Sequence, residues 1–325
     1  MKVFISASCD MHYGSFYIYG LYQLYGKKNV KFSSQYFKAF KHNNHFLAFI
    51  IKENNNIKKV IIDFTDSKLI DESALDWSDV YGKINLDDNV RVHPKIMAIG
   101  PSFGIRIYSL YETIWLASSN FLRSYNNIPN KRKFFSDYKA QYKRPQLAHY
   151  SYKPSESNFV FFMSSLWKQD IKTNKFRANF IQSCKANKSV DFEGGFAPRT
   201  KNDVKGYEEL TCLGRIVMQD YLKKTKLSAL VFNTPAVKEC HGWKLAEYLC
   251  LGKAIISTPM ERALPKELED KVHLLFTKGS TDDITEKVNA IISNVVLRQQ
   301  LEDNAQTYFE NHLAPRQVIT KLVAF

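Results

Sequence analysis

The chain has 325 residues, which is too long for one typical domain and suits two. Hydrophobic residues make up 45% of it and charged residues 24%, the composition of a globular, core-forming protein. The net charge of +14 favours a polyanion or an anionic lipid surface as partner, but it fits a solvated basic surface equally well.

Neither a membrane span, a secretory signal nor a metal centre is expected. No stretch approaches the roughly 20 apolar residues of a membrane span, and the first apolar run, residues 3–5, is too short for a signal peptide. The five cysteines are scattered and contain no C-x-x-C pair, which suits a reducing cytoplasm and argues against structural zinc. Cys240 and His241 are adjacent but have no further ligands nearby in the sequence, so we expect no metal.

The first part of the chain alternates short apolar strands with helices, as a doubly wound sheet does. Residues 2–6 predict a strand, Asp10 and His12 lie in the loop after it, and residues 16–24 predict an aromatic-rich helix. Ligands collect at the carboxyl ends of strands in such a sheet, so Asp10 and His12 are candidate site residues. The absence of a G-x-G-x-x-G motif after the first strand disfavours a dinucleotide site. Further strands are predicted at residues 30–34, 46–51 and 60–64.

Two further segments complete the predicted first domain. Asn54 and the two asparagines after it predict a turn between neighbouring strands. Residues 95–99 predict a strand that runs into a loop rich in Gly and Pro, and residues 108–121 are apolar with the spacing of a helix.

Residues 123–144 are basic and aromatic. Seven Lys or Arg stand there against a single acid, Asp137, and five Tyr or Phe lie among them. This mixture suits an anionic membrane surface, or else a solvated helix whose aromatic side chains pack inward. A nucleic acid is disfavoured as partner because no recognisable nucleic-acid motif accompanies the segment.

A second domain is expected after a linker at residues 143–158, which contains prolines and serines. Residues 159–165 predict its first, buried strand. Three basic residues follow that strand and either contact a ligand or form an exposed helix face; they are Lys168, Lys175 and Arg177. Residues 189–195 predict a strand that enters a glycine turn, and residues 207–224 predict a helix.

The most informative stretch is residues 229–259, which predict a strand, a loop, a helix and a second strand. Ala229 to Phe232 is a short buried strand, and Pro235 breaks it. The helix starts at Trp243, after Gly242, and Gly252 ends it before the next strand.

Two carboxylates flank the start of this helix: Glu239 lies in the loop before it, and Glu247 follows after seven residues, inside the helix. A helix start presents unpaired N–H groups and attracts phosphate. The two carboxylates can accept hydrogen bonds from sugar hydroxyls on either side of that phosphate. The alternative is an ordinary strand–helix–strand unit with two solvated glutamates.

The order of Glu239, Gly242, Glu247, Gly252 and a β-branched strand resembles the donor site of GT-B glycosyltransferases. It is most similar to the retaining Glu-seven-Glu branch, glycosyltransferase group 1 or family 4-like, although residues 240–244 depart from that branch's usual aromatic-Gly-Leu-Pro run. The resemblance covers residues 159–310 and is weak before them.

This resemblance implies the α/β GT-B fold, with two Rossmann-like domains that face a cleft. The acceptor-binding domain would span residues 1–150 and the donor-binding domain residues 151–310. Residues 311–325 would form a helix that crosses back to the first domain.

The resemblance also implies a hexosyltransferase that takes a nucleotide-diphosphate sugar as donor and needs neither a cofactor nor a metal. Glu247 would hold the ribose and Glu239 the transferred sugar, at the catalytic position. The donor diphosphate would lie against the helix start and one of the three basic residues after the first strand. The residues implied in donor binding are Lys168, Lys175, Arg177, His241, Gly242, Trp243, Lys244 and Glu247. If the reaction inverts, Asp10 or His12 is the candidate base; if it retains, the leaving phosphate takes the proton.

The acceptor is expected to be a lipid-linked saccharide in capsule or O-antigen assembly, because no export signal is predicted and residues 123–144 suit a membrane surface. The protein would then be cytoplasmic and peripheral to the inner face of the membrane. Two alternatives remain: a nucleotide-sugar 2-epimerase of the same fold, and a non-catalytic basic binding protein with a degenerate donor site.

Overall fold

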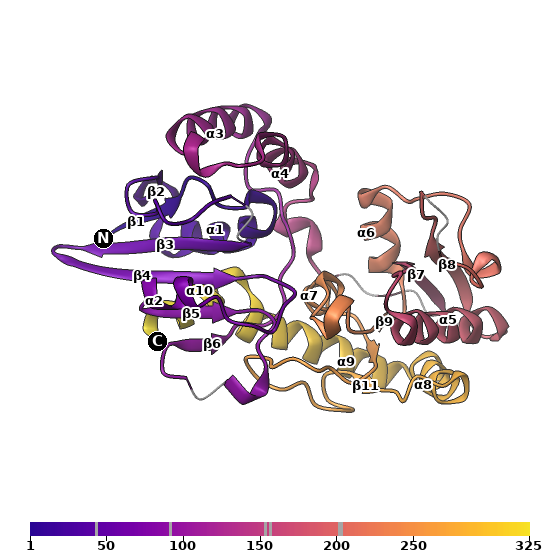
Figure 1. Cartoon of the computed structure of the whole chain (residues 1–325). Coiled ribbons are helices and arrows are strands. Elements are labelled where there is room, and N and C mark those ends of the chain that lie inside the picture. The colour runs from indigo at the N-terminus through magenta and orange to yellow at the C-terminus, as the bar shows by residue number, and fades with distance from the viewer. Residues whose placement is uncertain (43–44, 91–92, 153–154, 156–157, 201–203) are drawn as a thin grey trace. The chain divides into compact units, whose positions relative to one another are not determined.

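The structure, a computed structural model, describes residues 1–42, 45–90, 93–152, 155, 158–200 and 204–325 (Figure 1). Residues 153–154 and 156–157 of the predicted linker lie outside the described residues. The chain forms two compact units. Unit 1 consists of Met1–His149, Arg262–Lys266 and Asn311–Phe325, and unit 2 of Tyr150–Glu261 and Glu267–Glu310.

Unit 1 is built on one six-stranded sheet in the order β2-β1-β3-β4-β5-β6. Its strands are β1 (Lys2–Ser6), β2 (Val30–Ser33), β3 (Phe46–Glu53), β4 (Asn56–Asp63), β5 (Val80–Lys83) and β6 (Ile96–Ala98). The pairs β1–β2, β4–β5 and β5–β6 are parallel, with Val3 opposite Val30 and Val60 opposite Val80. The α/β layout expected from the sequence is therefore present.

One strand of this sheet runs against the others. β3 is antiparallel to both β1 and β4, and it forms a hairpin with β4 in which Glu53 pairs with Asn56. Asn54 sits in this turn at φ 53°, a left-handed conformation that asparagine tolerates well. The predicted turn is confirmed. Because a two-residue link cannot carry a crossover, it makes the sheet mixed instead of wholly parallel.

Helices cover the sheet of unit 1. They are α1 (Met11–Tyr25), α2 (Glu72–Trp77), α3 (Leu110–Arg123), α4 (Lys131–Lys143) and α10 (Pro315–Ala324), with short 3-10 turns at Lys27–Asn29, Asp88–Val90, Tyr125–Asn127 and Leu147–Tyr150. α1 begins earlier than the sequence predicted because the carboxylate of Asp10 accepts the backbone N–H groups of His12 and Tyr13 and so caps the helix.

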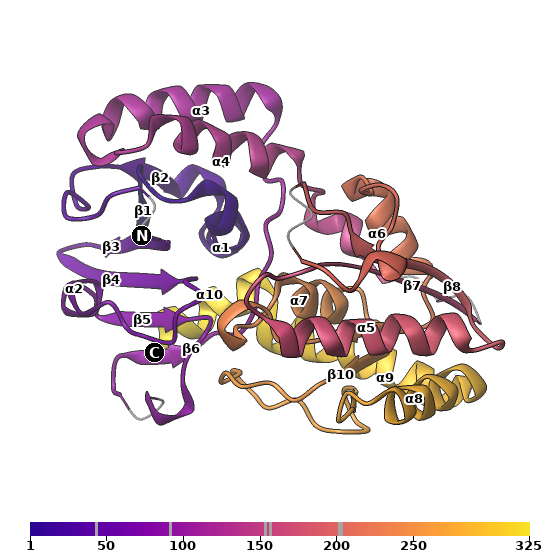
Figure 2. The same cartoon turned by 45° about the vertical axis from the view of Figure 1, so that its right-hand side comes forward.

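The last helix of the chain packs within unit 1, as expected of a helix that returns to the first domain. α10 lies against α1 (Figures 1 and 2). A Cβ atom at Gly20 of α1 would stand 2.4 Å from the carbonyl oxygen of Pro315, so the two helices approach too closely for any side chain there. The chain thus forms two successive α/β units, and its final helix belongs to the first of them.

The described residues of unit 2 form five strands, all paired in parallel: β7 (Phe159–Ser165), β8 (Asp191–Ala197), β9 (Val231–Asn233), β10 (Ile255–Ser257) and β11 (Leu275–Phe276). β10 lies between β9 and β11, and β7 pairs with β8. The N–H of Ala229 donates to the carbonyl of Phe159 at 2.7 Å, which sets β7 beside the chain entering β9. Across unit 2 the order is therefore β8, β7, β9, β10, β11.

This order has a reversal at β7 and β9. From β7 the chain moves to one side to form β8, and then returns to form β9 on the other side. In doubly wound sheets the crevice at such a switch point, outside the carboxyl ends of the two strands, is where ligands bind. In unit 2 those ends are Ser165 of β7 and Asn233 of β9.

The helices of unit 2 are α5 (Ile171–Ala186), α6 (Met218–Leu227), α7 (Trp243–Cys250), α8 (Thr281–Ser293) and α9 (Val295–Tyr308), with 3-10 turns at Glu208–Leu210 and Val237–Glu239 and a π-helical turn at Phe309–Leu313. The core between helices and sheet includes the rings of Phe180 and Phe232, which stack with centroids 4.5 Å apart. No helix of the described ranges is long and apolar enough to cross a membrane.

Two local predictions in unit 2 are wrong. The helix expected at 207–224 forms only from Met218, because the chain before it pairs with the end of β8: the N–H of Cys212 donates to the carbonyl of Phe196 at 2.8 Å. The expected glycine turn is instead part of β8. Gly194 lies there at φ 125°, and a Cβ atom would stand 1.9 Å from the carbonyl oxygen of Phe162.

Candidate functional site

Arg177 marks the switch point of unit 2. It comes from α5, and its Nε donates to Oγ1 of Thr234 at 3.0 Å while Nη1 donates to the carbonyl oxygen of Ser165 at 2.9 Å. Ser165 ends β7 and Thr234 follows β9, so these two hydrogen bonds hold the guanidinium at the carboxyl ends of both strands. Two of its five N–H donors are engaged in this way.

Arg177 remains a cation despite its burial. The side chain is almost fully buried, and loss of hydration lowers the pKa of Arg177 to about 10, still well above neutral. A fixed guanidinium at the end of a parallel sheet is suited to planar, bidentate recognition of a phosphate or carboxylate.

Lys244 adds a second cation from the first turn of α7. Its Nζ donates to the carbonyl oxygen of Met163 and lies 4.9 Å from the ring centroid of Phe162 and 5.6 Å from that of Tyr221. Burial, and then the positive charge of Arg177, lower the pKa of Lys244 to about 7, against the opposing effect of Glu247. An anion bound near these two cations would favour the charged form of Lys244.

Gly242 is the N-cap of α7, as predicted, with φ −80° and ψ 154°. This conformation suits any residue, and a Cβ atom would meet only the Cβ of Ala236 at 3.6 Å. As a glycine, Gly242 has no side chain with which to cap the first amides of α7. The missing side chain therefore leaves the helix start approachable, and backbone strain does not explain the glycine.

Glu247 is almost fully buried on α7, so it is not the solvated glutamate of the alternative interpretation. Its Oε1 accepts a hydrogen bond from the hydroxyl of Tyr150 at 3.5 Å.

Glu239, by contrast, is exposed at the end of a 3-10 turn. Lys238 and Glu239 both have positive φ, 56° and 60°, which costs a non-glycine residue about 1–3 kcal/mol and is common at functional sites. His241, two residues after Glu239, is buried.

The three basic candidates after β7 differ in their placement. Lys168 is exposed in the segment between β7 and α5, and Lys175 is exposed on α5, whereas Arg177 is turned inward onto the strand ends. Asn174 shapes this segment, because its side chain both accepts the N–H of Trp167 and donates to the Trp167 carbonyl. Thr234, Tyr150 and Asn174 were not singled out from the sequence, since no motif marks them.

The candidate bases Asp10 and His12 belong to unit 1. Asp10 is almost fully buried; its Oδ1 caps α1, and its Oδ2 lies 3.7 Å from Nζ of Lys133. Burial, and then the charge of Asp137, raise the pKa of Asp10. Burial, and then the charge of Arg144, lower the pKa of His12 to about 4, so His12 is neutral at pH 7.

A metal centre was not expected from the sequence, and the described side chains include no group of three or more His, Cys, Asp or Glu placed to hold an ion. Arg177 and Lys244 donate to backbone carbonyls of β7, and the carboxylate of Glu247 on α7 acts electrostatically on Lys244. Such a set can bind an anion next to neutral hydroxyl groups.

No protein-family model matches the chain, and no curated protein matches it. It is similar to solved structures. One is the C-terminal domain of a glycosyl transferase group 1 family protein, LpcC, from Francisella tularensis, with 16% identity over 49% of this chain and 86% of that one and a TM-score of 0.35.

Two other solved structures cover more of this chain. Alr3699/HepE from Anabaena, in complex with UDP, has 13% identity over 81% of this chain and 77% of that one, with a TM-score of 0.45. A putative UDP-N-acetylglucosamine 2-epimerase from Listeria monocytogenes has 12% identity over 77% and 73%, with a TM-score of 0.38.

Proposed function

We propose that the protein is a glycosyltransferase that moves a sugar from a nucleotide-diphosphate sugar to an acceptor hydroxyl. The observation that carries this proposal is the position of Arg177, fixed at the carboxyl ends of β7 and β9 beside Lys244. A leaving diphosphate gains negative charge during transfer, which the fixed guanidinium of Arg177 stabilises without reorganisation and Lys244 stabilises in its protonated form.

The other donor contacts follow from α7. The amides of Trp243 and Lys244 at the helix start would take diphosphate oxygens, since Gly242 leaves them approachable. Glu247 would accept hydrogen bonds from the ribose hydroxyls, and the exposed Glu239 would do the same for the transferred sugar. His241 precedes the helix start, and Lys168 and Lys175 would guide the donor as exposed charges.

We propose that no cofactor or metal is required, because Arg177, Lys244 and the helix start supply the positive charge that a metal ion would otherwise contribute. Under a retaining course, the leaving phosphate accepts the acceptor proton. Under an inverting course, a base is needed, and the neutral His12 or the buried Asp10 would supply it.

For the acceptor, we propose a lipid-linked saccharide in surface polysaccharide biosynthesis, at the inner face of the cytoplasmic membrane. Support comes from α4, which carries most of the basic residues of segment 123–144. Exposed cations next to aromatic side chains suit an acceptor presented at an anionic surface.

The test is donor turnover. UDP-, GDP- and dTDP-sugars are incubated with membrane lipid extracts, and release of the nucleoside diphosphate is followed together with sugar incorporation into lipid. We expect one donor to turn over, and Arg177→Met to abolish turnover while Lys175→Met, on the exposed side of the same helix, retains it. Epimerised donor without diphosphate release would instead indicate the 2-epimerase, and no change in any donor would contradict the proposal.

A further inference from the structure

Most of the large apolar side chains of α3 are exposed, which is the reverse of what a helix packed on a protein core usually shows. The side chains it turns into unit 1 are small or polar, namely Thr113, Ala117 and Asn120. Most of the large apolar ones face outward, and they include Tyr111 and Leu122, which are 80% and 76% exposed, whereas Leu116 and Phe121 are partly buried. The exposed apolar residues of α3 are Leu110, Tyr111, Ile114, Trp115 and Leu122. They form two adjacent pairs four residues apart, 110–111 and 114–115, and Leu122 follows seven residues after Trp115, which places all five on one side of the helix.

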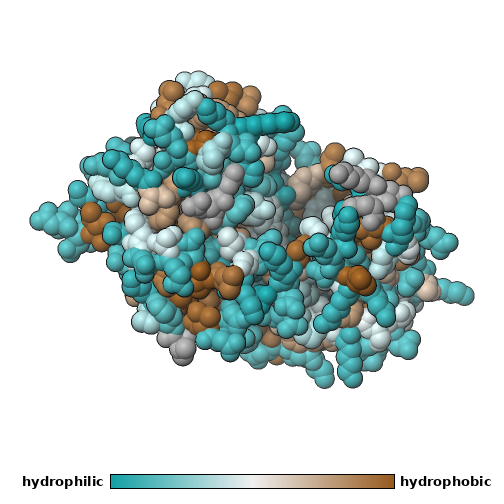
Figure 3. Space-filling view, viewed as in Figure 1, coloured by the Kyte–Doolittle hydropathy of each residue, from teal (hydrophilic) through white to brown (hydrophobic). Residues whose placement is uncertain are grey.

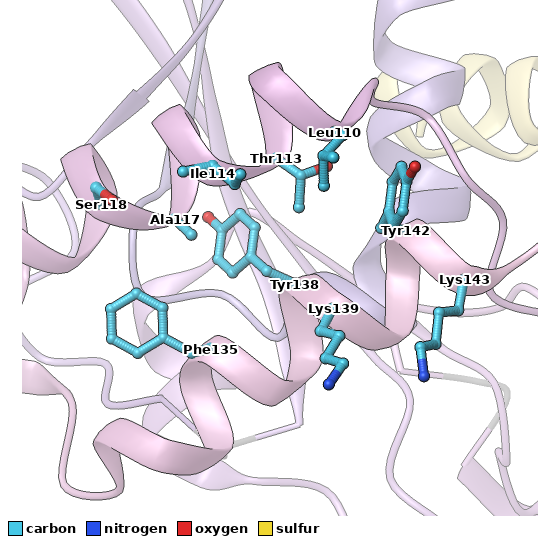
Figure 4. Close-up of a pocket in the computed structure, with 10 residues that line it drawn as sticks. All are labelled: Leu110, Thr113, Ile114, Ala117, Ser118, Phe135, Tyr138, Lys139, Tyr142 and Lys143. Atoms are coloured by element: carbon cyan, nitrogen blue, oxygen red, sulfur yellow. The ribbon is translucent and has the colours of Figure 1, made fainter.

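The neighbouring helix α4 extends this apolar face. A groove of about 410 Å³ runs between α3 and α4, and Figure 4 shows Leu110 and Ile114 on one side of it and Phe135 and Tyr142 on the other. Phe135 is itself 42% exposed. Figure 3 shows the hydrophobic side chains gathered on the surface over α3, beside hydrophilic ones. Patches of this kind on a soluble surface mark interaction sites.

Positive charge surrounds the apolar face. The exposed basic residues of the two helices are Arg123, Lys131, Arg132, Lys139 and Lys143. Lys139 and Lys143 line the groove directly, and Nζ of Lys131 lies 4.0 Å from the ring centroid of the half-exposed Tyr125. The two acids of these helices are already engaged: Glu112 with Lys27, and Asp137 with Lys133 and His42. The outward face is therefore apolar at its centre and cationic around it.

We propose that this α3–α4 face docks on the surface of an anionic phospholipid bilayer, with Trp115 and its apolar neighbours in the acyl boundary and the lysines at the headgroups. Helices that lie in a membrane interface combine an apolar face bearing Trp or Leu with a Lys- and Arg-rich border. A second copy of the chain is the poorer occupant, because two-fold pairing would bring the same cations together. The membrane contact thus depends on the exposed apolar residues of α3, which precede the segment 123–144 singled out from the sequence.

The test is sedimentation of the full chain with phosphatidylcholine vesicles that contain or lack phosphatidylglycerol, with no nucleotide present. We expect binding to the anionic vesicles, weakened by salt, and at least about tenfold less in Lys139→Glu/Lys143→Glu. The matched control is Lys31→Glu/Lys52→Glu, which makes the same charge change at exposed sites of unit 1 and should leave binding within about twofold of wild type after the shared loss of net charge.

The apolar contribution is tested separately. Trp115→Ser/Leu122→Ser should lose binding, whereas Leu69→Ser, at another exposed position of unit 1, should keep it. Brominated acyl chains should quench the tryptophan fluorescence of bound wild type, and Trp115→Phe should remove most of that quenching. Absence of vesicle binding, equal binding by the α3 variant, or a wild-type dimer that Trp115→Ser converts to a monomer would each overturn the proposal. Because no donor enters these assays, their failure would leave the proposed transferase activity untouched.

Discussion

The hydroxyl of Tyr150 donates a long hydrogen bond, 3.5 Å, to Oε1 of Glu247, and both side chains are almost fully buried. The contact lies within unit 2 and joins its first described residue to the middle of α7. Glu247 also lies close enough to Lys244 for its charge to oppose the fall in the lysine pKa. Burial of a carboxylate near a buried lysine costs free energy, and charged groups kept in this way are candidate ligand-binding residues.

The first prediction concerns this carboxylate. Glu247→Gln keeps the shape and an acceptor for Tyr150 but loses the charge, so we expect donor affinity to fall about tenfold or more, the usual value of a hydrogen bond to a charged group. Isothermal titration with the donor measures it. Glu286→Gln, at an exposed site on α8, is the matched control and should bind as wild type does. Unchanged affinity in Glu247→Gln would remove this residue from the site.

The second prediction compares the contributions of Arg177 and Lys175 to donor binding. Arg177→Met should weaken donor binding by about 1.5–3 kcal/mol, because a guanidinium hydrogen bond to a charged group is lost. Lys175→Met should change it by no more than about 1 kcal/mol, since Lys175 is exposed. Circular dichroism of both variants confirms that they are folded before binding is measured. Equal losses in the two variants would show that Arg177 has no special position.

The lowered pKa of Lys244 predicts that the free energy of unfolding depends on pH. Its pKa falls from the usual 10.5 to about 7 in the folded chain, so the unfolded chain binds more protons between these values and stability rises with pH across that window. Lys244→Met, which cannot titrate, should be more stable than wild type near pH 6, and its advantage should shrink as pH rises towards 10. Urea unfolding at several pH values measures this difference. A constant advantage at all pH values would show that Lys244 does not titrate as described.

Donor binding should raise the lowered pKa of Lys244 again. The diphosphate of a sugar donor favours the protonated lysine, so binding near pH 8 should take up a proton. Calorimetry in two buffers of different ionisation enthalpy detects this uptake. Lys244→Arg keeps its charge throughout, and in that variant the uptake should disappear while binding remains.

Substitution of Gly20 should lower stability, whereas substitution of Gly242 should lower donor affinity. Gly20→Ala would place a Cβ atom 2.4 Å from the Pro315 carbonyl, and we expect a loss of about 1–3 kcal/mol in the free energy of unfolding as α10 is pushed off α1. Gly242→Ala meets only Ala236 at 3.6 Å, so stability should change little while donor affinity falls. Thermal unfolding and donor titration separate the two effects. Full donor affinity in Gly242→Ala would show that the helix start is not a phosphate site.

Local patterns in the sequence were enough to predict α7 and the strands around it. The apolar runs, Gly242 at the helix start and Gly252 at its end act within a few residues, and the helix indeed begins at Trp243. The segment 207–217 was mispredicted because its partner, the carbonyl of Phe196, is remote in the sequence. Local propensity yields to such a contact.

The choice of site residues depended on tertiary structure. Lys168, Lys175 and Arg177 are equivalent in the sequence, and only the packing of α5 on β7 and β9 turns Arg177 onto Ser165 and Thr234. The exposure of the apolar side of α3 could not be predicted from the sequence for a related reason. A helical pattern predicts an apolar side but does not say whether that side meets the core or the solvent.

The central claim is that the β7–β9 switch point of unit 2, with Arg177 and the start of α7, binds a nucleotide-diphosphate sugar. The most direct measurement is a thermal-shift panel of UDP-, GDP- and dTDP-sugars, headed by UDP-glucose, on wild type and on Arg177→Met. We predict that one nucleotide class at about 100 times its wild-type Kd stabilises wild type by about 2.7 kcal/mol and Arg177→Met, with its weaker binding, by only about 0.3–1.3 kcal/mol. Stabilisation of both proteins alike, or of neither by any donor, would contradict the claim.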